Sequence, residues 1–158
     1  MTAPLEYELG VIRLFGLGDI GTAGLERGFA PPEAEHCWSD GPEATLALVL
    51  PLPLRPLALA VEGEPYVSRT APVQSITLFA NGRRVSAWWL RARAPTVLRA
   101  AIDPDLFLVR RSRALLNLTF GLPNAVAPYD AGDGPDERQL AFCFRTICLR
   151  AAEPCCGR

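Results

Sequence analysis

The residues best suited to chemistry gather in one short stretch, GFAPPEAEHCWSDG, at residues 28–41. It holds the chain's single histidine, His36, one of its five cysteines, Cys37, and three carboxylates. A zinc site needs three or four ligands, usually in two close pairs, and no second histidine exists. Adjacent residues rarely present their side chains to each other, which disfavours a cysteine–histidine nucleophile pair. We therefore expect no metal and no cofactor, and interpret the stretch first as a structural corner and second as a sugar-binding rim.

Two predicted loops are rich in carboxylates. Their acidic residues are Glu33, Glu35, Asp40 and Glu43 before one strand, and Asp130, Asp133, Asp136 and Glu137 within residues 129–138. Two facing carboxyl groups could hydrolyse a glycosidic bond, and clustered oxygen ligands could bind calcium. Ordinary turn residues explain the same pattern, with Arg138 satisfying a carboxylate locally. We favour the ordinary loops and expect no catalytic residues, while calcium binding stays open.

The elements that position these residues are short apolar runs separated by proline and glycine. The predicted strands are Ala44–Leu50, Leu57–Val61, Gln74–Ala80, Val85–Leu90, Thr96–Ile102, Ala114–Phe120 and Ala141–Leu149. Helix is limited to a turn or two near Asp103–Phe107, where Asp-Pro could begin one. The pattern predicts an all-β fold, an antiparallel β-sandwich or jelly roll of about eight strands. We assign residues 1–150 to this single domain and expect residues 151–158 to form a flexible tail.

One hairpin can be predicted in detail. Asn81-Gly82 lies between two strand runs, and both residues tolerate the positive φ of a two-residue type I′ turn. An uninterrupted ladder then pairs Ala80 with Arg83, Leu78 with Val85 and Ile76 with Ala87. Strict alternation of side chains places Trp89 in the core and Trp88 on the outer face. An outer tryptophan could stack on a sugar or contact another subunit, although cover by a loop of its own chain is the simpler expectation.

Charge and hydropathy exclude several classes of protein. The net charge is −1 and all sixteen basic residues are arginine, without the concentrated basic surface that nucleic-acid binding needs. No apolar run is long enough to span a membrane, and the N-terminus lacks the pattern of a signal peptide. We therefore expect no membrane insertion, and a location in the cytoplasm or in an assembled particle. The odd number of cysteines favours reduced thiols, and alternation directs Cys143 and Cys148 to opposite faces of their strand.

Three segments, in order, carry a family resemblance: GFAPPE…CWSDGPEATLALVLP, QSITLFANGRRVSAWWL and LNLTFGLPNAVAPYDAGDGPDERQLAFCFRTICL. Over residues 8–150 they resemble a β-sandwich, carbohydrate-binding-module-like domain appended to many bacterial glycosyltransferases and phosphoglycerol-transferase-type enzymes. The matching positions are Gly28, Phe29, Pro32, Glu33, Trp38, Ser39, Gly41, Asn81, Gly82, Trp88, Leu116, Leu118, Phe120, Pro123, Pro128, Asp136 and Arg138. The family's Trp-Gly-Arg is replaced here by Ala34-Glu35-His36-Cys37, which removes one aromatic from that corner.

The resemblance implies a non-catalytic accessory domain that binds a glycan or polysaccharide in bacterial glycan synthesis or at the cell surface. Its partners would be the glycan, a glycosyltransferase, or other subunits of a homo- or hetero-oligomer. Because sugars are recognised by aromatic faces and planar polar groups, the candidate ligand-binding residues are Glu33, Trp38, Tyr66, Trp88, Tyr129, Asp136 and Arg138. The alternative is a structural jelly-roll subunit of a larger assembly, such as a polysaccharide-synthesis complex or the glycan-binding spike of a phage-like particle. A hydrolase that uses the acidic loops ranks third.

Overall fold

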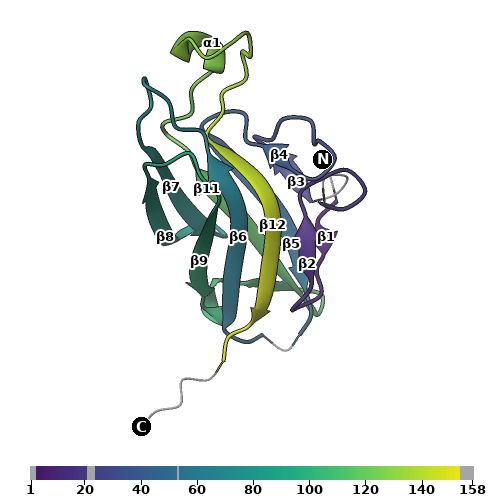
Figure 1. Cartoon of the computed structure of the whole chain (residues 1–158). Helices are drawn as coiled ribbons and strands as arrows, with labels where there is room; N and C mark the ends of the chain where they lie inside the picture. The colour runs from purple at the N-terminus through teal and green to yellow at the C-terminus, as the bar shows by residue number, and fades with distance from the viewer. Residues whose placement is uncertain (1–2, 21–23, 53, 154–158) are drawn as a thin grey trace.

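The chain folds into two facing β-sheets (Figure 1). The computed structural model describes residues 3–20, 24–52 and 54–153. Their strands are β1 (Leu5–Glu6), β2 (Ile12–Leu14), β3 (Leu25–Arg27), β4 (Cys37–Trp38), β5 (Glu43–Leu50), β6 (Leu57–Pro65), β7 (Gln74–Ala80), β8 (Arg83–Leu90), β9 (Thr96–Ile102), β10 (Leu108–Arg110), β11 (Arg113–Gly121) and β12 (Phe142–Ala151). A 3₁₀ turn at Pro104–Leu106 and the helix α1 (Pro128–Ala131) complete the elements. The predicted antiparallel β-sandwich is confirmed.

The two sheets have different widths. Sheet A has seven strands in the order β1-β5-β11-β7-β8, with β3 beside β5 and β10 beside β11. Sheet B has five strands in the order β2-β12-β6-β9, with β4 beside β12. Every strand pair is antiparallel except β1 with β5. The seven predicted runs are the long strands of both sheets, and most of them extend one to four residues further than predicted.

The core lies between the sheets and follows from the two-residue period of the strands. Alternate residues of β6 and β11 are buried, whereas β5 is buried along nearly its whole length. Aromatic rings fill the space near β12, where Phe144 contacts Phe15, Phe29, Phe120 and Phe142 at centroid distances of 4.9–5.4 Å. No helix in the described part of the chain is long and apolar enough to cross a membrane.

The β7–β8 hairpin has the predicted turn but not the predicted register. Asn81 and Gly82 both have positive φ, and Ala80 pairs with Arg83. A β-bulge then places one extra residue, Val85, in β8, so that Leu78 pairs with Ser86 and Ile76 with Trp88. A bulge reverses the alternation beyond it. The predicted faces of the tryptophans are therefore wrong: Trp88 packs against the core, and Trp89 is 62% exposed on the outer face of sheet A.

A second bulge corrects the prediction for the cysteines of β12. The register of β12 against β6 shifts between Phe144 and Thr146, so that Cys143 lies opposite Glu64 and Cys148 opposite Ala60. Glu64 and Ala60 share the outer face of β6, and both cysteines therefore lie on the outer face of sheet B. All three cysteines in the described residues are free thiols. Ala151, which we had placed in the tail, belongs to β12, and residues 154–158 lie outside the described residues.

Candidate functional site

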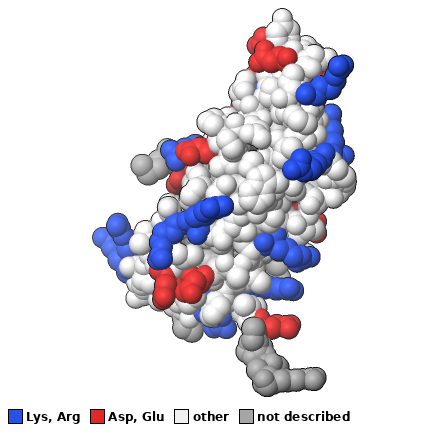
Figure 2. Space-filling view, turned by 90° about the vertical axis from the view of Figure 1, so that its left-hand side faces the viewer, with Lys and Arg blue, Asp and Glu red and all other residues white. Residues whose placement is uncertain are grey.

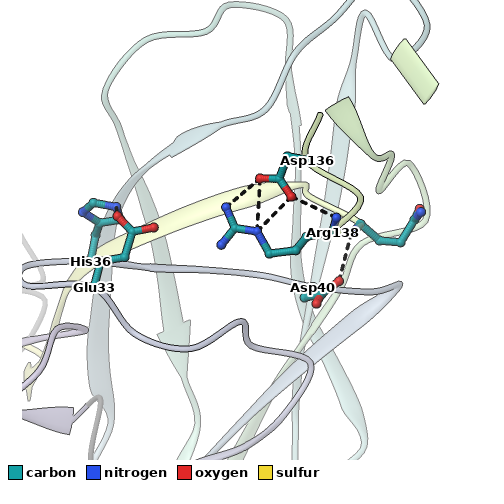
Figure 3. A network of polar contacts seen from close by, with 6 residues as sticks. Glu33, His36, Asp40, Asp136 and Arg138 are labelled. Carbon is teal, nitrogen blue, oxygen red and sulfur yellow. Dashed lines mark hydrogen bonds and ion pairs between the residues drawn. The ribbon is translucent and has the colours of Figure 1, made fainter. Parts of the chain in front are cut away.

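The corner at residues 38–41 is fastened to the segment that precedes β12. The buried Ser39 accepts hydrogen bonds through Oγ from the N–H groups of Ala141 and Phe142, at 3.2 and 3.0 Å. Asp40 accepts one from the N–H of Gln139 at 2.9 Å (Figure 3). Trp38, in β4, pairs with Cys143 of β12. These contacts bring Trp38 beside Arg138 although the two residues are a hundred positions apart, and they support the interpretation of the stretch as a structural corner.

Tyr66 directly follows β6, and its N–H, its carbonyl and its hydroxyl each form a hydrogen bond. Its N–H donates to Ala141 O at 2.8 Å, and its carbonyl accepts a hydrogen bond from Gln74 Nε2 at 2.6 Å. Its hydroxyl donates to Asp133 Oδ2 at 2.7 Å. Burial, and then the hydrogen bond to Asp133, raise the pKa of Tyr66 to about 12. The ring is therefore fixed in orientation and stays a neutral phenol at physiological pH.

Two further side chains, those of Trp38 and Arg93, contact the Tyr66 ring. The indole of Trp38 meets it edge to face, with centroids 6.4 Å apart and planes at 83°. The guanidinium carbon of Arg93 lies 5.2 Å from the Tyr66 centroid, within the range of a cation–π contact. Arg93 comes from the loop between β8 and β9, and no pattern in the sequence pointed to it. Tyr66 itself is only 2% exposed, so the accessible aromatic surface comes from the partly exposed Trp38, beside the cation of Arg93.

Asp136 and Arg138 form an ion pair, and both residues lie close to Trp38 and Tyr66. Asp136 accepts hydrogen bonds from the backbone N–H, Nε and Nη2 of Arg138, the last at 2.7 Å (Figure 3). The side-chain hydrogen bonds from Arg138 lower the pKa of Asp136, and the same contacts raise the pKa of Arg138. Among the described residues, Nη1 of Arg138 has no hydrogen-bond partner. The pair therefore presents rigid, charged donors and acceptors.

These side chains enclose one open pocket of about 360 Å³, which we call the aromatic pocket. It is lined by Trp38, Tyr66, Arg93, Pro128, Asp133, Asp136, Arg138 and Leu140. The volume lies in the range typical of small-ligand sites. Four of the seven candidate ligand-binding residues line it: Trp38, Tyr66, Asp136 and Arg138. Arg93 and Asp133 are lining residues that we had not assigned, although Asp133 belongs to the acidic loop noticed in the sequence.

The other three candidates lie outside this pocket. Glu33 Oε2 lies 2.8 Å from His36 Nε2 (Figure 3). The negative charge of Glu33 also contributes to raising the pKa of Arg138. Tyr129, in α1, donates a hydrogen bond from its N–H to Asp136 O, and the residue is 62% exposed. Trp88 lies on the other sheet, partly buried against the core. Glu33 and Tyr129 therefore lie near the pocket, whereas Trp88 lies away from it.

The reactive residues of the opening stretch are engaged elsewhere. Cys37 is fully buried, its Sγ donates to Ala30 O at 3.1 Å, and burial raises its pKa to about 12. His36 pairs with Glu33. No group of three or more His, Cys, Asp or Glu side chains that could hold a metal ion occurs in the described residues. A general acid for glycoside hydrolysis needs a raised carboxyl pKa, whereas Asp136 has a lowered one.

The pocket opens beside a positively charged flank. Residues 74–102 contain five arginines and no Asp or Glu, and Arg93 and Arg99 belong to this run. Figure 2 shows the side of β8 and β9, where blue arginines are spread over a mostly uncharged surface. Among the described residues, none of these five arginines forms an ion pair. Their charge therefore remains available to ligands that approach from this side.

The hydroxyl of Tyr66 offers a direct test of the pocket's geometry. Replacing Asp133 with asparagine should lower the pKa of Tyr66 from about 12 towards 10, because the negative charge that favours the protonated phenol is removed. Ultraviolet titration of tyrosine ionisation, in a Tyr7→Phe background, measures the shift. Asp130→Asn, in the same loop, is the matched control and should leave the titration unchanged. Equal titration curves for the two variants would contradict the contact.

Comparisons with known proteins report on the fold. No protein-family model matches the sequence, and no curated protein is significantly similar to it. A CBM36-1 domain of a multidomain xylanase from the hindgut metagenome of Trinervitermes trinervoides is similar in structure, with a TM-score of 0.53 and 7% identity over 91% of this chain and 98% of that one.

A second similar structure is the GH115 4-O-methyl-α-glucuronidase BtGH115A, with specificity for decorated arabinogalactans. Its TM-score is 0.54 at 8% identity, over 97% of this chain. The match spans 19% of that much longer enzyme. The first of these two structures is itself a carbohydrate-binding module. The chain described here shares its β-sandwich fold with that module.

Proposed function

We propose that the chain is a non-catalytic carbohydrate-binding module that holds a glycan in the aromatic pocket. One observation carries the proposal: Trp38 and Tyr66 meet edge to face beside Arg93 and the Asp136–Arg138 pair. Sugar rings present apolar C–H faces and a girdle of hydroxyls, so they pack on aromatic rings while charged planar groups accept and donate hydrogen bonds. The fold shared with carbohydrate-binding modules supports this function.

Rigidity of the site favours binding. Tyr66 is fixed by Asp133 and Gln74, and Arg138 is fixed by Asp136. Side chains that are already ordered lose little conformational entropy when a ligand arrives. The carboxylates are already engaged in hydrogen bonds, which favours recognition over hydrolysis. The resemblance noted in the sequence adds a context, and we place the module in bacterial glycan synthesis or modification, as an accessory to a glycosyltransferase.

Truncating the indole tests this function. Trp38→Ala should weaken glycan binding by roughly 30-fold, about 2 kcal/mol, as for a central aromatic anchor. Binding is measured by titration calorimetry against xylan, arabinogalactan, and neutral and acidic bacterial polysaccharides. Arg93→Ala provides a second variant at an exposed loop position, where unfolding is not expected. It should weaken binding as well, because the cation over Tyr66 is lost.

Trp89→Ala is the matched control, since it removes an exposed indole from the opposite sheet. It should bind as the parent chain does. If no polysaccharide in the panel binds the parent chain, or if Trp38→Ala and Trp89→Ala bind equally well, the function is refuted.

A second candidate is a structural subunit of a larger assembly, and the exposure of Trp89 favours it. Tryptophan is enriched at protein interfaces, and the exposed indole of Trp89 offers such a contact on the outer face of sheet A. Light scattering at increasing concentration tests this candidate. An oligomer that dissociates on Trp89→Ala would support it, and a monomer at all concentrations would count against self-assembly.

A further inference from the structure

We propose that the bound glycan continues beyond the aromatic pocket along the outer face of β6, so that the module holds an internal stretch of a linear polysaccharide. The inference rests on the proposed function and extends the binding site from the aromatic pocket to the outer face of β6, which we call the track. In Figure 1, β9, β6 and β12 lie side by side, and β6 ends below α1. The aromatic pocket is at this end, because Tyr66 directly follows β6 and Pro128 opens α1.

The floor of the track follows from the alternation along β6. Leu57, Leu59, Val61 and Gly63 face the core and are buried. The intervening residues face outwards, in the order Ala58, Ala60, Glu62 and Glu64. Tyr66, just beyond the end of β6, is buried in contact with Trp38 and Arg93. At about 3.3 Å per residue, Ala58 and Tyr66 lie about 26 Å apart. The face of this strand is therefore long enough for several sugar units.

A second hollow lies on the same face, at the far end from the aromatic pocket. It has a volume of about 220 Å³, and we call it the lower groove. Its floor contains Ala58 and Ala60. The residues opposite Ala60 are Arg99 on β9 and Cys148 on β12, and Cys148 in turn lies opposite Ile12 of β2. Small side chains at the centre and larger ones at both sides give the sheet a shallow channel.

The walls of the lower groove carry polar groups that suit hydroxyls. Glu62, Thr146, Arg99 and Arg150 line it. No ion pair engages these two arginines among the described residues. Glu62 and Glu64 continue the polar row along β6 towards Tyr66. Charged groups are depleted at the centre of protein interfaces, so this row favours a hydrated polysaccharide over a second copy of the chain.

Chain length is the decisive variable for this track. The probe is the polysaccharide of the panel that binds most tightly, partially hydrolysed and separated by size. A hexasaccharide should bind at least about tenfold more tightly than a disaccharide, because only the longer chain reaches the lower groove. Ala60→Leu raises the floor and should remove that gain, while disaccharide binding stays within about twofold of the parent value.

Ala87→Leu is the matched control, an identical change on the outer face of sheet A, and it should retain the gain. Arg99→Ala, compared with Arg84→Ala, gives a second pair at exposed strand positions where folding is not at risk. Equal affinity for short and long chains, or equal effects within either pair, would overturn the track. In those cases a loss of binding on Trp38→Ala would still support glycan binding in the aromatic pocket. The two proposals can therefore be refuted independently of each other. A dimer that Ala60→Leu disrupts would also overturn the track, in favour of self-association.

Discussion

Replacing Gly28 with alanine is expected to lower the free energy of unfolding by about 4 kcal/mol, which few single substitutions do. Gly28 has a φ of +77°, and a Cβ at this position would lie 1.8 Å from Glu43 O and 2.8 Å from Ala44 Cα. These are backbone atoms of β5, so the clash cannot be relieved by moving one flexible side chain. Gly28 O also accepts a hydrogen bond from Asp40 N–H at 2.7 Å, which ties the substitution to the corner that holds Trp38.

Gly132→Ala is the control that measures the cost of a positive φ without the cost of a steric clash. Gly132 has a φ of +75°, and a Cβ there would have no atom within 4 Å. It should cost only the left-handed conformation itself, roughly 1–2 kcal/mol. Denaturation in urea measures both variants. A similar loss for both would show that the close approach of residue 28 to β5 does not matter.

Phe144→Ala should destabilise the fold by about 3–5 kcal/mol, the usual range for deleting a buried phenylalanine. Its fully buried ring contacts four other phenylalanine rings. One of them, Phe120, belongs to β11 of the opposite sheet, so Phe144 joins the two layers. Phe79→Ala is the control, because Phe79 is half-buried on the outer face of sheet A, and about 1 kcal/mol is expected there. Equal effects in thermal unfolding would contradict the assigned core.

The strands could be predicted from the sequence because their determinants are local. Apolar runs of five to nine residues, bounded by proline and glycine, marked all seven long strands, and Asn81-Gly82 marked a turn. The bulges could not be predicted in this way. One extra residue at Val85 decides which tryptophan is buried, and no local pattern in the sequence marks its position; Trp88 packs against the core as a result. The bulge near Phe144 likewise decides the face of Cys148.

The candidate site was predicted in part, for a related reason. Trp38, Tyr66, Asp136 and Arg138 are aromatic or charged residues at strand ends and in loops, and these are the residue types that bind sugars. Arg93 could not be chosen, because nothing local distinguishes it from the chain's other arginines. Its position over Tyr66 arises from the path of the loop between β8 and β9. Side-chain type is thus visible in the sequence, whereas proximity is created by the tertiary fold.

The most direct measurement of the central claim is to observe which tryptophan the ligand touches. The chain contains three tryptophans, and each indole N–H gives its own signal in a ¹H–¹⁵N spectrum, assigned through single Trp→Phe variants. Titration with the tightest-binding polysaccharide fragment should shift the signal of Trp38, which lines the aromatic pocket, and leave those of Trp88 and Trp89 in place. A shift confined to Trp89, or no shift of Trp38 at saturation, would contradict binding at the aromatic pocket.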